Sequence, residues 1–449
     1  MRIINGFDAA KLAISRRVAP QSYAISADLA ASLKKMFDTV DPAVAVAKII
    51  EEVRLNGDRA LIDYARMIDR VELSAIEIPP KEIIAAKKRV PPELLSAIVT
   101  AAGRITEFHD NQFNAYISGV KKMAPGTVAR VLDRVGMYVP GGTASYPSSV
   151  LMTAIPARSA RVREIIVCTP PAKNGKIPDM TLAAASVAGV DRVFTAGGAQ
   201  AIAAMAYSTE SVPAVDKICG PGNIFVMLAK KYVYGSVDID GLQGPSEVVV
   251  IADANANAYW CAGDMLAQAE HDVMAQSILI TTSADLASAV LKQLDMRANN
   301  LSRKAVINES LASRGAICVV EKMDQAVALA NLYAPEHLCI YAADSARIAR
   351  GINSAGCVFK GTHPSVVMGD YVAGPSHALP TGGTARFASP LNTTDFVRLM
   401  NVVDVDDRMM TRFGPVAAIL AEAEGLSAHA EAVRLPRESK QIMRTANDE

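Results

Sequence analysis

The sequence predicts an α/β fold made of two tandem Rossmann-like units, each a doubly wound parallel sheet, with helical segments at the N- and C-termini. From about Val135 onward, short apolar runs alternate with helical patterns, and the alternation starts again at Ser246. Several of the strand-to-helix turns carry glycine. Because strands that alternate with helices are joined by crossover connections, this order favours parallel sheets.

The region before the first unit is predicted to be helical. We expect residues 1–30 to form a small N-terminal helical arm. Between 41 and 113, apolar residues recur at spacings of three and four, as they do on amphipathic helices. Asn56-Gly57 divides the first part of this region into two helices, because glycine interrupts a helical pattern. We assign 31–134, together with 246–391, to one α/β domain.

The first α/β unit, residues 135–245, is predicted to bind a nucleotide. Three of its strand-to-helix turns are rich in glycine, namely PGG (140–142), GGAQ (197–200) and GPGN (220–223). Glycine lets the backbone approach a phosphate, and the helix that follows favours its negative charge. Any one of these loops could be an ordinary tight turn, but three at one sheet edge favour a ligand crevice. Tyr138, Gln200 and Asn223 are the polar groups beside the glycines.

The second unit, residues 246–391, contains a helix with a candidate pair of metal ligands. Its predicted strands are SEVVVIAD, SILITT, AICVVE, HLCIYA and CVFKG. Gln268 and His271 are three residues apart, so both side chains lie on one helix face. An imidazole and an amide oxygen in that arrangement can share a metal ion, although most such pairs are solvated surface residues. From about residue 392, the pattern is helical to the C-terminus.

Composition excludes several classes of protein. The 449 residues include 46 Lys plus Arg and 46 Asp plus Glu, and a neutral balance argues against a nucleic-acid or membrane-surface binder. The N-terminus has no signal-peptide core, and no apolar run is long enough to span a membrane. The six cysteines form no CxxC pair, which favours buried free thiols. We therefore expect a soluble cytoplasmic protein whose metal ligands, if any, are His, carboxylate and amide groups.

Two further groups of residues are candidates for chemistry. Glu336 and His337 are adjacent where a helix meets a strand, and such a pair can divide acid and base work, although a surface pair is the alternative. Asp370 is a lone acid in a glycine-rich loop, where functional groups are often carried. Glu424 and His429 lie on or between the terminal helices.

The remaining histidines are predicted to be structural or superficial. His109 follows Phe108 in a charged helix, so we expect it at the surface. His363 and His377 lie in loops rich in glycine and proline, and either could be structural.

The chain resembles histidinol dehydrogenase along nearly its whole length. The matching stretches occur in the family's order, and they are VGMYVPGGTASYPSSVLM, AGGAQAIAAMAY, KICGPGN, GPSEVVVIAD, MLAQAEHD, NLYAPEHL, MGDYVAGPSHALPTGGTARF and AEGLSAHAEAV. The resemblance implies the oxidation of L-histidinol to L-histidine in two NAD-dependent steps, through bound L-histidinaldehyde, with one zinc ion per subunit.

The resemblance also implies roles for individual residues. The family's zinc ligands fall on Gln268, His271, Asp370 and His429. Its acid/base pair falls on Glu336 and His337, and its NAD contacts fall on Tyr138, Gln200 and Asn223. Its substrate-binding positions fall on Ser246, Gln268, His271, His337, Asp370, Glu424 and His429.

By the same resemblance, the protein is a homodimer in which the C-terminal segment, residues 392–449, reaches the partner's active site. Glu424 and His429 would then serve the neighbouring subunit. Two departures from the family's pattern put loop geometry in doubt. Ser376 stands where asparagine is expected, and residues 399–402 differ from the usual basic, serine-rich run.

Two alternatives remain open. One is a sister zinc- and NAD-dependent dehydrogenase that oxidises another small alcohol on the same scaffold. It would be expected to lose the imidazole-binding residues of the terminal segment, but Glu424 and His429 are both present. The other is a catalytically silent nucleotide-binding or scaffold protein, which would be expected to lose Glu336 or His337, and neither is lost.

Overall fold

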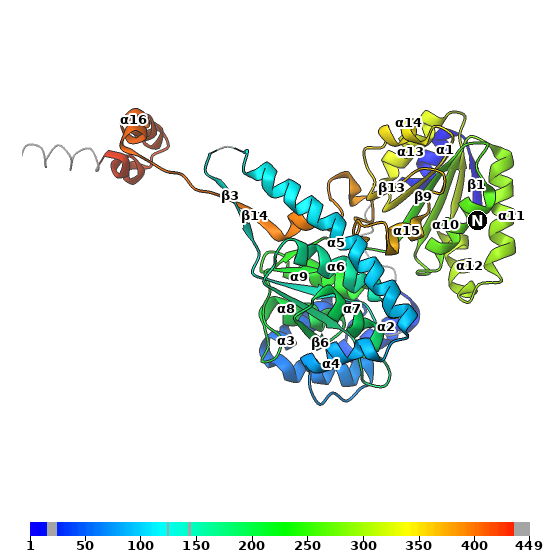
Figure 1. Cartoon of the computed structure of the whole chain (residues 1–449), viewed down its shortest axis with the longest axis horizontal. Helices are drawn as coiled ribbons and strands as arrows, with labels where there is room; N and C mark the ends of the chain where they lie inside the picture. The colour runs from blue at the N-terminus through cyan, green and yellow to red at the C-terminus, as the bar shows by residue number, and fades with distance from the viewer. Residues whose placement is uncertain (16–24, 124, 142–144, 435–449) are drawn as a thin grey trace, which may run out of the picture. The chain divides into compact units, whose positions relative to one another are not determined.

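The computed structural model of the chain describes residues 1–15, 25–123, 125–141 and 145–434 (Figure 1). It divides into two compact units. The larger unit comprises Met1–Tyr116 and Val131–Arg398, and the smaller comprises Ile117–Arg130 and Leu399–Glu449. Within its described residues, the larger unit contains two six-stranded sheets flanked by helices, which confirms the predicted α/β class with two parallel-sheet units.

The sheet of the first α/β unit has the strand order β2-β6-β5-β4-β7-β8. Its strands are β2 (Glu77–Ile78), β4 (Arg134–Tyr138), β5 (Glu164–Thr169), β6 (Arg192–Thr195), β7 (Lys217–Cys219) and β8 (Asp238–Ile239). All neighbours are parallel except β2 and β6. The chain first moves from β4 through β5 to β6, and then returns to the other side of β4 at β7. A switch point therefore lies between β4 and β7, where such sheets bind ligands at the carboxyl ends of their strands.

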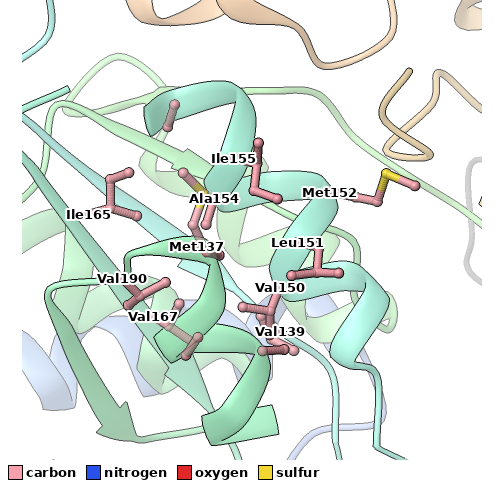
Figure 2. Close-up of a cluster of buried hydrophobic side chains, with 14 of the residues drawn as sticks. Met137, Val139, Val150, Leu151, Met152, Ala154, Ile155, Ile165, Val167 and Val190 are labelled. Atoms are coloured by element: carbon pink, nitrogen blue, oxygen red, sulfur yellow. The ribbon is translucent and has the colours of Figure 1, made fainter. Parts of the chain in front are cut away.

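Successive side chains of these strands enter two different hydrophobic cores. Val135, Met137 and Val139 belong to one cluster, whereas Tyr138 belongs to the other. This alternation follows from the two-residue period of a strand, and it requires apolar residues on both faces. Figure 2 shows the first cluster, with Val150 of α6 (Pro147–Ser159) directed toward the strand residues.

The helices and the strand between residues 31 and 88 pack on or pair with the first sheet, which corrects the assignment of this region to the second unit. Helices α2 and α3 bury their apolar faces in the same core as α8 and α9, and β2 pairs with β6. The sequence could not make this assignment, because a helical pattern gives no information about which sheet the helix packs on. From residue 27 to residue 233, the helices are α2 (Ala27–Phe37), α3 (Pro42–Tyr64), the π-helix η1 (Ala65–Asp69), α4 (Pro80–Ala85), the 3-10 helix η2 (Ala86–Lys88), α5 (Pro92–Val120), α6, α7 (Asp179–Ala188), α8 (Gly198–Tyr207) and α9 (Ile224–Val233).

The predicted break at Asn56-Gly57 is present as a kink inside α3. Gly57 has φ 50° and ψ −131°, which is not helical. A Cβ atom at this position would lie 2.3 Å from a carboxylate oxygen of Glu210, and the same oxygen accepts a 2.8 Å hydrogen bond from the Asp58 amide. The positive φ therefore favours glycine here, and a side chain at this position would also displace the Glu210 carboxylate.

The second sheet repeats the topology of the first, with the order β1-β11-β10-β9-β12-β13 and parallel pairing throughout the described strands. Its switch point lies between β9 and β12. The strands are β1 (Arg2–Asn5), β9 (Glu247–Ala252), β10 (Gln276–Thr281), β11 (Ala316–Val319), β12 (His337–Tyr341) and β13 (Cys357–Phe359). The helices are α1 (Phe7–Ile14), α10 (Ala258–Ala269), α11 (Ala284–Ala298), α12 (Lys304–Ser313), α13 (Met323–Tyr333), α14 (Ser345–Arg350) and α15 (Val366–Tyr371).

The N-terminal segment is part of this second sheet and is not a helical arm. Strand β1 pairs with β11 at the sheet edge, and α1 packs against α13 with Ala10 and Ile14 in the core. The four residues of β1 show no clear alternation of polar and apolar side chains, so the sequence did not predict a strand here. The rest of the predicted arm includes residues 16–24, which lie outside the described residues.

The C-terminal region is helical only in part. The 3-10 helices η3 (Thr384–Arg386) and η4 (Thr393–Phe396) precede strand β14 (Val397–Asn401), which pairs with β3 (Thr127–Val131). The expectation of helix from residue 392 is therefore wrong at β14, because pairing with strand β3 makes these residues a strand. Helix α16 (Asp407–Ala423) follows in the smaller unit, and a further helix begins at residue 427.

Candidate active site

The predicted acid/base pair lies at the start of the central strand β12. Helix α13 ends at Tyr333, and Ala334 adopts a left-handed conformation with φ 52°, which turns the chain toward β12. Glu336 and His337 are only 6% and 5% exposed. The surface alternative for this pair is therefore excluded in the structure.

Glu247, the first residue of the neighbouring strand β9, orients both members of the pair through its backbone. Its amide donates a 2.7 Å hydrogen bond to Oε2 of Glu336, and its carbonyl oxygen lies 3.2 Å from Nδ1 of His337. A carbonyl oxygen accepts only, so this contact assigns the proton of His337 to Nδ1. Nε2 is then the nitrogen available to exchange a proton with a substrate.

Two carboxylates flank the imidazole of His337. Oε2 of Glu336 lies 3.5 Å from Nδ1, and Oδ1 of Asp370, on α15, lies 3.5 Å from Nε2. Burial alone would lower the pKa of His337, but the two carboxylates outweigh it and raise the pKa well above its usual value. In return, although burial opposes it, His337 lowers the pKa of Asp370.

His377, in the loop after α15, belongs to the same cluster. Burial lowers its pKa, and its charge interactions are with Asp370, His337, Glu336 and His271. Its Nε2 atom is buried and has no hydrogen-bond partner among the described residues. A buried polar atom without a partner is costly, which is consistent with a site completed by a ligand.

The loop that carries His377 is anchored at its flanking residues. Ser376 is buried, donates a 2.8 Å hydrogen bond to the carbonyl of Met152 and accepts one from the Ala378 amide. The side chain of Glu247 accepts a 3.0 Å hydrogen bond from the Gly382 amide. The serine found where the family pattern has asparagine is thus a defined anchor of this loop.

Gln268 lies in the last turn of α10, which ends at Ala269, whereas His271 lies in the turn that follows, so the two residues do not share a helix face as the sequence predicted. The His271 amide donates a 3.2 Å hydrogen bond to the Gln268 carbonyl in this turn. Gln268 is 1% exposed, and its Nε2 atom has no hydrogen-bond partner among the described residues, whereas His271 is exposed. His271 is close enough to contribute to the charge environment of Asp370. These three residues therefore offer an amide, an imidazole and a carboxylate on neighbouring elements. That donor set suits zinc, which takes nitrogen and oxygen ligands and needs four in all.

The other two predicted residues of this group lie in the smaller unit. Glu424 caps the C-terminus of α16, His429 lies in the helix that begins at residue 427, and both are exposed. Across the described residues, no three His, Cys, Asp or Glu side chains converge closely enough to hold a metal ion. Ser246, which immediately precedes Glu247, is half-buried, and its carbonyl oxygen accepts from the Gln276 amide at 3.0 Å.

The candidate nucleotide residues lie at the carboxyl edge of the first sheet. Tyr138 is the last residue of β4, and its hydroxyl oxygen accepts a 3.1 Å hydrogen bond from the amide of Gly198, at the start of α8. Gln200 follows in the same first turn and is 3% exposed. Burial raises the pKa of Tyr138 to about 12, so this hydroxyl stays protonated at neutral pH.

The third candidate, Asn223, is exposed and caps helix α9. Its side-chain oxygen accepts from the amides of Phe225 and Val226. The loop that contains it follows β7, so it borders the switch point between β4 and β7. Gly141 and Gly197 both pack against Pro170, where an added Cβ would lie 3.0 and 2.6 Å from the ring. Gly142 lies outside the described residues.

The candidate nucleotide residues lie at a carboxyl edge, where strands end, whereas the acid/base pair lies at an edge where strands begin. His337 and Glu247 begin their strands, so the pair lies at the amino edge of the second sheet. A separate cavity of about 400 Å³ is lined by residues that include Tyr341, the last residue of β12, and Trp260, at the start of α10. None of the predicted site residues lines it.

Sequence reasoning missed two members of the site and misjudged one histidine. The first is Glu247, a charged residue at the start of an apolar strand directly after Gly-Pro-Ser, and this unusual position could have identified it. The second is His377, which follows Ser376 within one of the stretches that match the family. His109 is fully buried, not superficial as expected, and its Nδ1 lies 2.9 Å from the Ile105 carbonyl within α5. An amphipathic helix buries the residues along one of its faces even when the residues next to them in the sequence are charged.

Two expectations from composition can be compared with the structure. All six cysteines are free thiols, five of them buried, as expected. Among the described residues, no helix has both the length and the apolar character needed to cross a membrane.

Comparison with known proteins identifies close relatives over almost the entire chain. The family model described as histidinol dehydrogenase matches residues 33–436. The histidinol dehydrogenase of Dehalococcoides mccartyi (strain CBDB1) is 53% identical over 433 residues, covering 96% of this chain and 99% of the relative. That of Clostridium acetobutylicum is 46% identical over 389 residues, covering 86% and 90% of the two chains.

A solved structure agrees with this result. The crystal structure of histidinol dehydrogenase from Elizabethkingia anophelis superposes with a TM-score of 0.85 at 34% identity. It covers 98% of this chain and 99% of its own.

Proposed function

The chain belongs to the histidinol dehydrogenase family, and we propose that it oxidises L-histidinol to L-histidine through bound L-histidinaldehyde, using two NAD⁺ and one zinc ion per subunit. The oxidoreductase class follows from the family. The observation that best supports the specific chemistry is the buried Glu336–His337 pair, with Nε2 of His337 directed to Asp370 and Nδ1 held by the Glu247 carbonyl.

Gln268, His271 and Asp370, together with His429 of the smaller unit, are the residues proposed to hold zinc. When bound, the ion would orient the amine and imidazole nitrogens of the substrate and so fix its carbinol carbon. The Gln268 amide, which is buried at the end of α10, and the partly buried Asp370 carboxylate on α15 support this assignment.

His337 is proposed to accept the proton of the substrate hydroxyl at Nε2 in the first oxidation, to release it to solvent, and to accept a second proton in the next oxidation. Its imidazole must be neutral for this purpose. In the chain alone, Glu336 and Asp370 favour the charged form of His337. A cation bound to Asp370 would offset one of these carboxylates and thereby lower the pKa of His337.

Glu336 is proposed to deprotonate the water that adds to the bound aldehyde. Only the second oxidation requires this water, so the two members of the pair have separable roles. The hydrogen bond from the Glu247 amide fixes one oxygen of the carboxylate, and we assign the other oxygen to the reacting water. Ser246 is adjacent to this amide, which supports its proposed role in substrate binding.

Tyr138, Gln200 and Asn223 are proposed to contact NAD⁺, which supplies the hydride acceptor in each oxidation. Their support is topological, because all three lie in the turns at the carboxyl ends of β4, β6 and β7. The glycines beside them let a pyrophosphate approach the backbone.

We also propose that the protein is a homodimer in which Glu424 and His429 complete the partner's active site. Both residues belong to a compact unit separate from the one that carries Glu336 and His337, and both are exposed in the single chain. Because zinc and substrate sites are enclosed, these exposed side chains need another protein surface to complete such a site, and a partner subunit would provide it.

One assay tests the overall proposal. NADH formation is measured with L-histidinol and with a panel of other small amino alcohols. The proposal predicts two NADH per histidinol and no comparable turnover of the other alcohols. If another alcohol is preferred, the chain is a sister enzyme on the same scaffold. If histidinol is not oxidised, the proposed function is wrong.

A further inference from the structure

The ammonium group of Lys230 is buried beneath the glycine loop that follows β7. The side chain is 1% exposed, and it extends from the last turn of α9 toward the residues that precede that helix. Nζ donates a 3.1 Å hydrogen bond to the carbonyl of Gly220 and a 2.7 Å bond to Oε1 of Gln243. It also forms an ion pair with Asp240, whose side chain is likewise 1% exposed.

These contacts use the full hydrogen-bonding capacity of the lysine. An ammonium group has three protons, and Lys230 has three acceptors, all within the protein. Lys230 therefore has no donor left for a nucleotide phosphate. Its effect on a ligand must act through the residues that it holds.

The residue held most firmly is Gly220. Its carbonyl accepts from Lys230, and its amide donates a 2.7 Å hydrogen bond to Oδ2 of Asp240. The Lys230–Asp240 ion pair thus forms hydrogen bonds with both the carbonyl and the amide of Gly220. Hydrogen bonds to charged partners are stronger than those between neutral groups, so the position of this residue is closely defined.

The opposite side of Gly220 packs against the end of β4. Gly220 has φ +115°, and a Cβ atom there would lie 2.1 Å from the carbonyl oxygen of Tyr138. The loop is therefore confined between the Tyr138 backbone and the buried ion pair. Asn223 follows three residues later and caps α9, so its placement depends on the same anchor.

We propose that Lys230 is a positioning residue of the nucleotide site. With Asp240, it fixes the Gly220 peptide so that the start of α9 and Asn223 are already in place when the dinucleotide binds. The proposal rests on the proposed NAD-dependent function. Preorganised groups need not be ordered during binding, so loss of the anchor weakens nucleotide binding more than substrate binding.

A purely structural ion pair is the competing explanation, and the same sheet provides a matched control. Lys217 is also buried, at 5% exposed, and pairs with Asp238 and Asp395. It begins β7, whereas Gly220 follows the end of that strand. Breaking the Lys217 pairs disturbs the same strand at the end remote from the glycine loop.

The test variant is Lys230→Met/Asp240→Asn, which leaves no unpaired buried charge and keeps an acceptor for the Gly220 amide. Binding of NADH is measured by fluorescence, with steady-state kinetics for both substrates and thermal denaturation of each protein. We expect the Kd for NADH to rise at least tenfold, while the KM for histidinol stays within twofold of wild type. Lys217→Met should lower the melting temperature but leave the Kd for NADH within twofold. Lys231→Met, a change at the exposed neighbour, should alter neither quantity.

Asp240→Asn alone provides a second variant. It keeps the lysine and its other two acceptors but leaves the buried ammonium group without a carboxylate, and it should shift the Kd for NADH in the same direction. The inference is overturned if either variant folds and binds NADH as wild type does, or if Lys217→Met weakens NADH binding equally. A wild-type protein that binds no NADH would instead overturn the proposed function, and the inference with it.

Discussion

The backbone amide of Glu247 donates a 2.7 Å hydrogen bond to the carboxylate of Glu336, from the first residue of β9 to the residue that precedes β12. Because β9 and β12 are neighbours at the switch point of the second sheet, the orientation of this carboxylate is set by the sheet itself. Groups placed on such rigid elements hold their geometry better than groups on loops.

The acid/base pair is tested first. Glu336→Gln keeps an oxygen that can accept from the Glu247 amide, but it cannot accept a proton. It should slow the oxidation of histidinaldehyde by about 10²-fold or more and spare the oxidation of histidinol, because only the aldehyde step needs an activated water.

His337→Asn should slow both steps by a similar factor. Rates measured separately with histidinol and with histidinaldehyde distinguish the two variants. Equal losses at both steps in the Glu336 variant would contradict the division of roles.

The metal assignment predicts loss of activity without loss of fold. A chelator should reduce turnover to background while circular dichroism and the melting transition still report a folded protein, because the four hydrophobic clusters of the sheets do not depend on an ion. His271→Asn should lower the zinc content of the purified protein. His363→Asn, at an exposed histidine that we do not assign to the site, should not. Full zinc occupancy and normal turnover in the His271 variant would exclude this residue from the site.

The shared-site proposal is tested with mixed dimers. Inactive Glu336→Gln/His337→Asn chains and inactive His429→Asn chains are denatured and refolded together in equal amounts. Random pairing makes half of the dimers mixed, and a mixed dimer with shared sites has one site with both lesions and one with neither. About a quarter of full activity should therefore return. If His429 serves its own chain, every site of the mixed dimer carries one lesion, and activity stays at background.

Acid stability should depend on His109. Burial lowers the pKa of this histidine below its usual value of 6.5. The unfolded chain therefore binds a proton more readily than the folded chain, and the stability that neutral His109 permits is present above pH 6.5 and lost as the pH falls. The loss from this one group amounts to at most about 1.4 kcal/mol per pH unit.

Denaturant unfolding of wild type and of His109→Gln between pH 7.5 and 5 measures this effect. The difference between their free energies of unfolding should shrink or reverse as the pH falls. A constant difference for His109→Gln would show that burial does not perturb this group.

Much of the fold could be predicted from local patterns. The strands of both units are apolar runs such as 164–168, and their order along the chain, each followed by a helix, is sufficient to predict parallel sheets. The glycine turns predicted a ligand crevice in the first unit, and the structure places them at the carboxyl edge of its sheet. The helices of residues 31–134 could not be assigned to a sheet, because amphipathicity indicates that a helix has a buried face but not what covers it.

The sequence by itself determined the α/β class, the residue types available for chemistry and, through the resemblance of its motifs, the family. Only the tertiary structure decided that Glu247 orients Glu336 and His337, that Ser376 anchors the loop of His377, and that β1 closes the edge of the second sheet. These are contacts between residues far apart in the chain. Local propensity carries no information about them, because they form only when strand pairing and the packing of the cores bring the segments together.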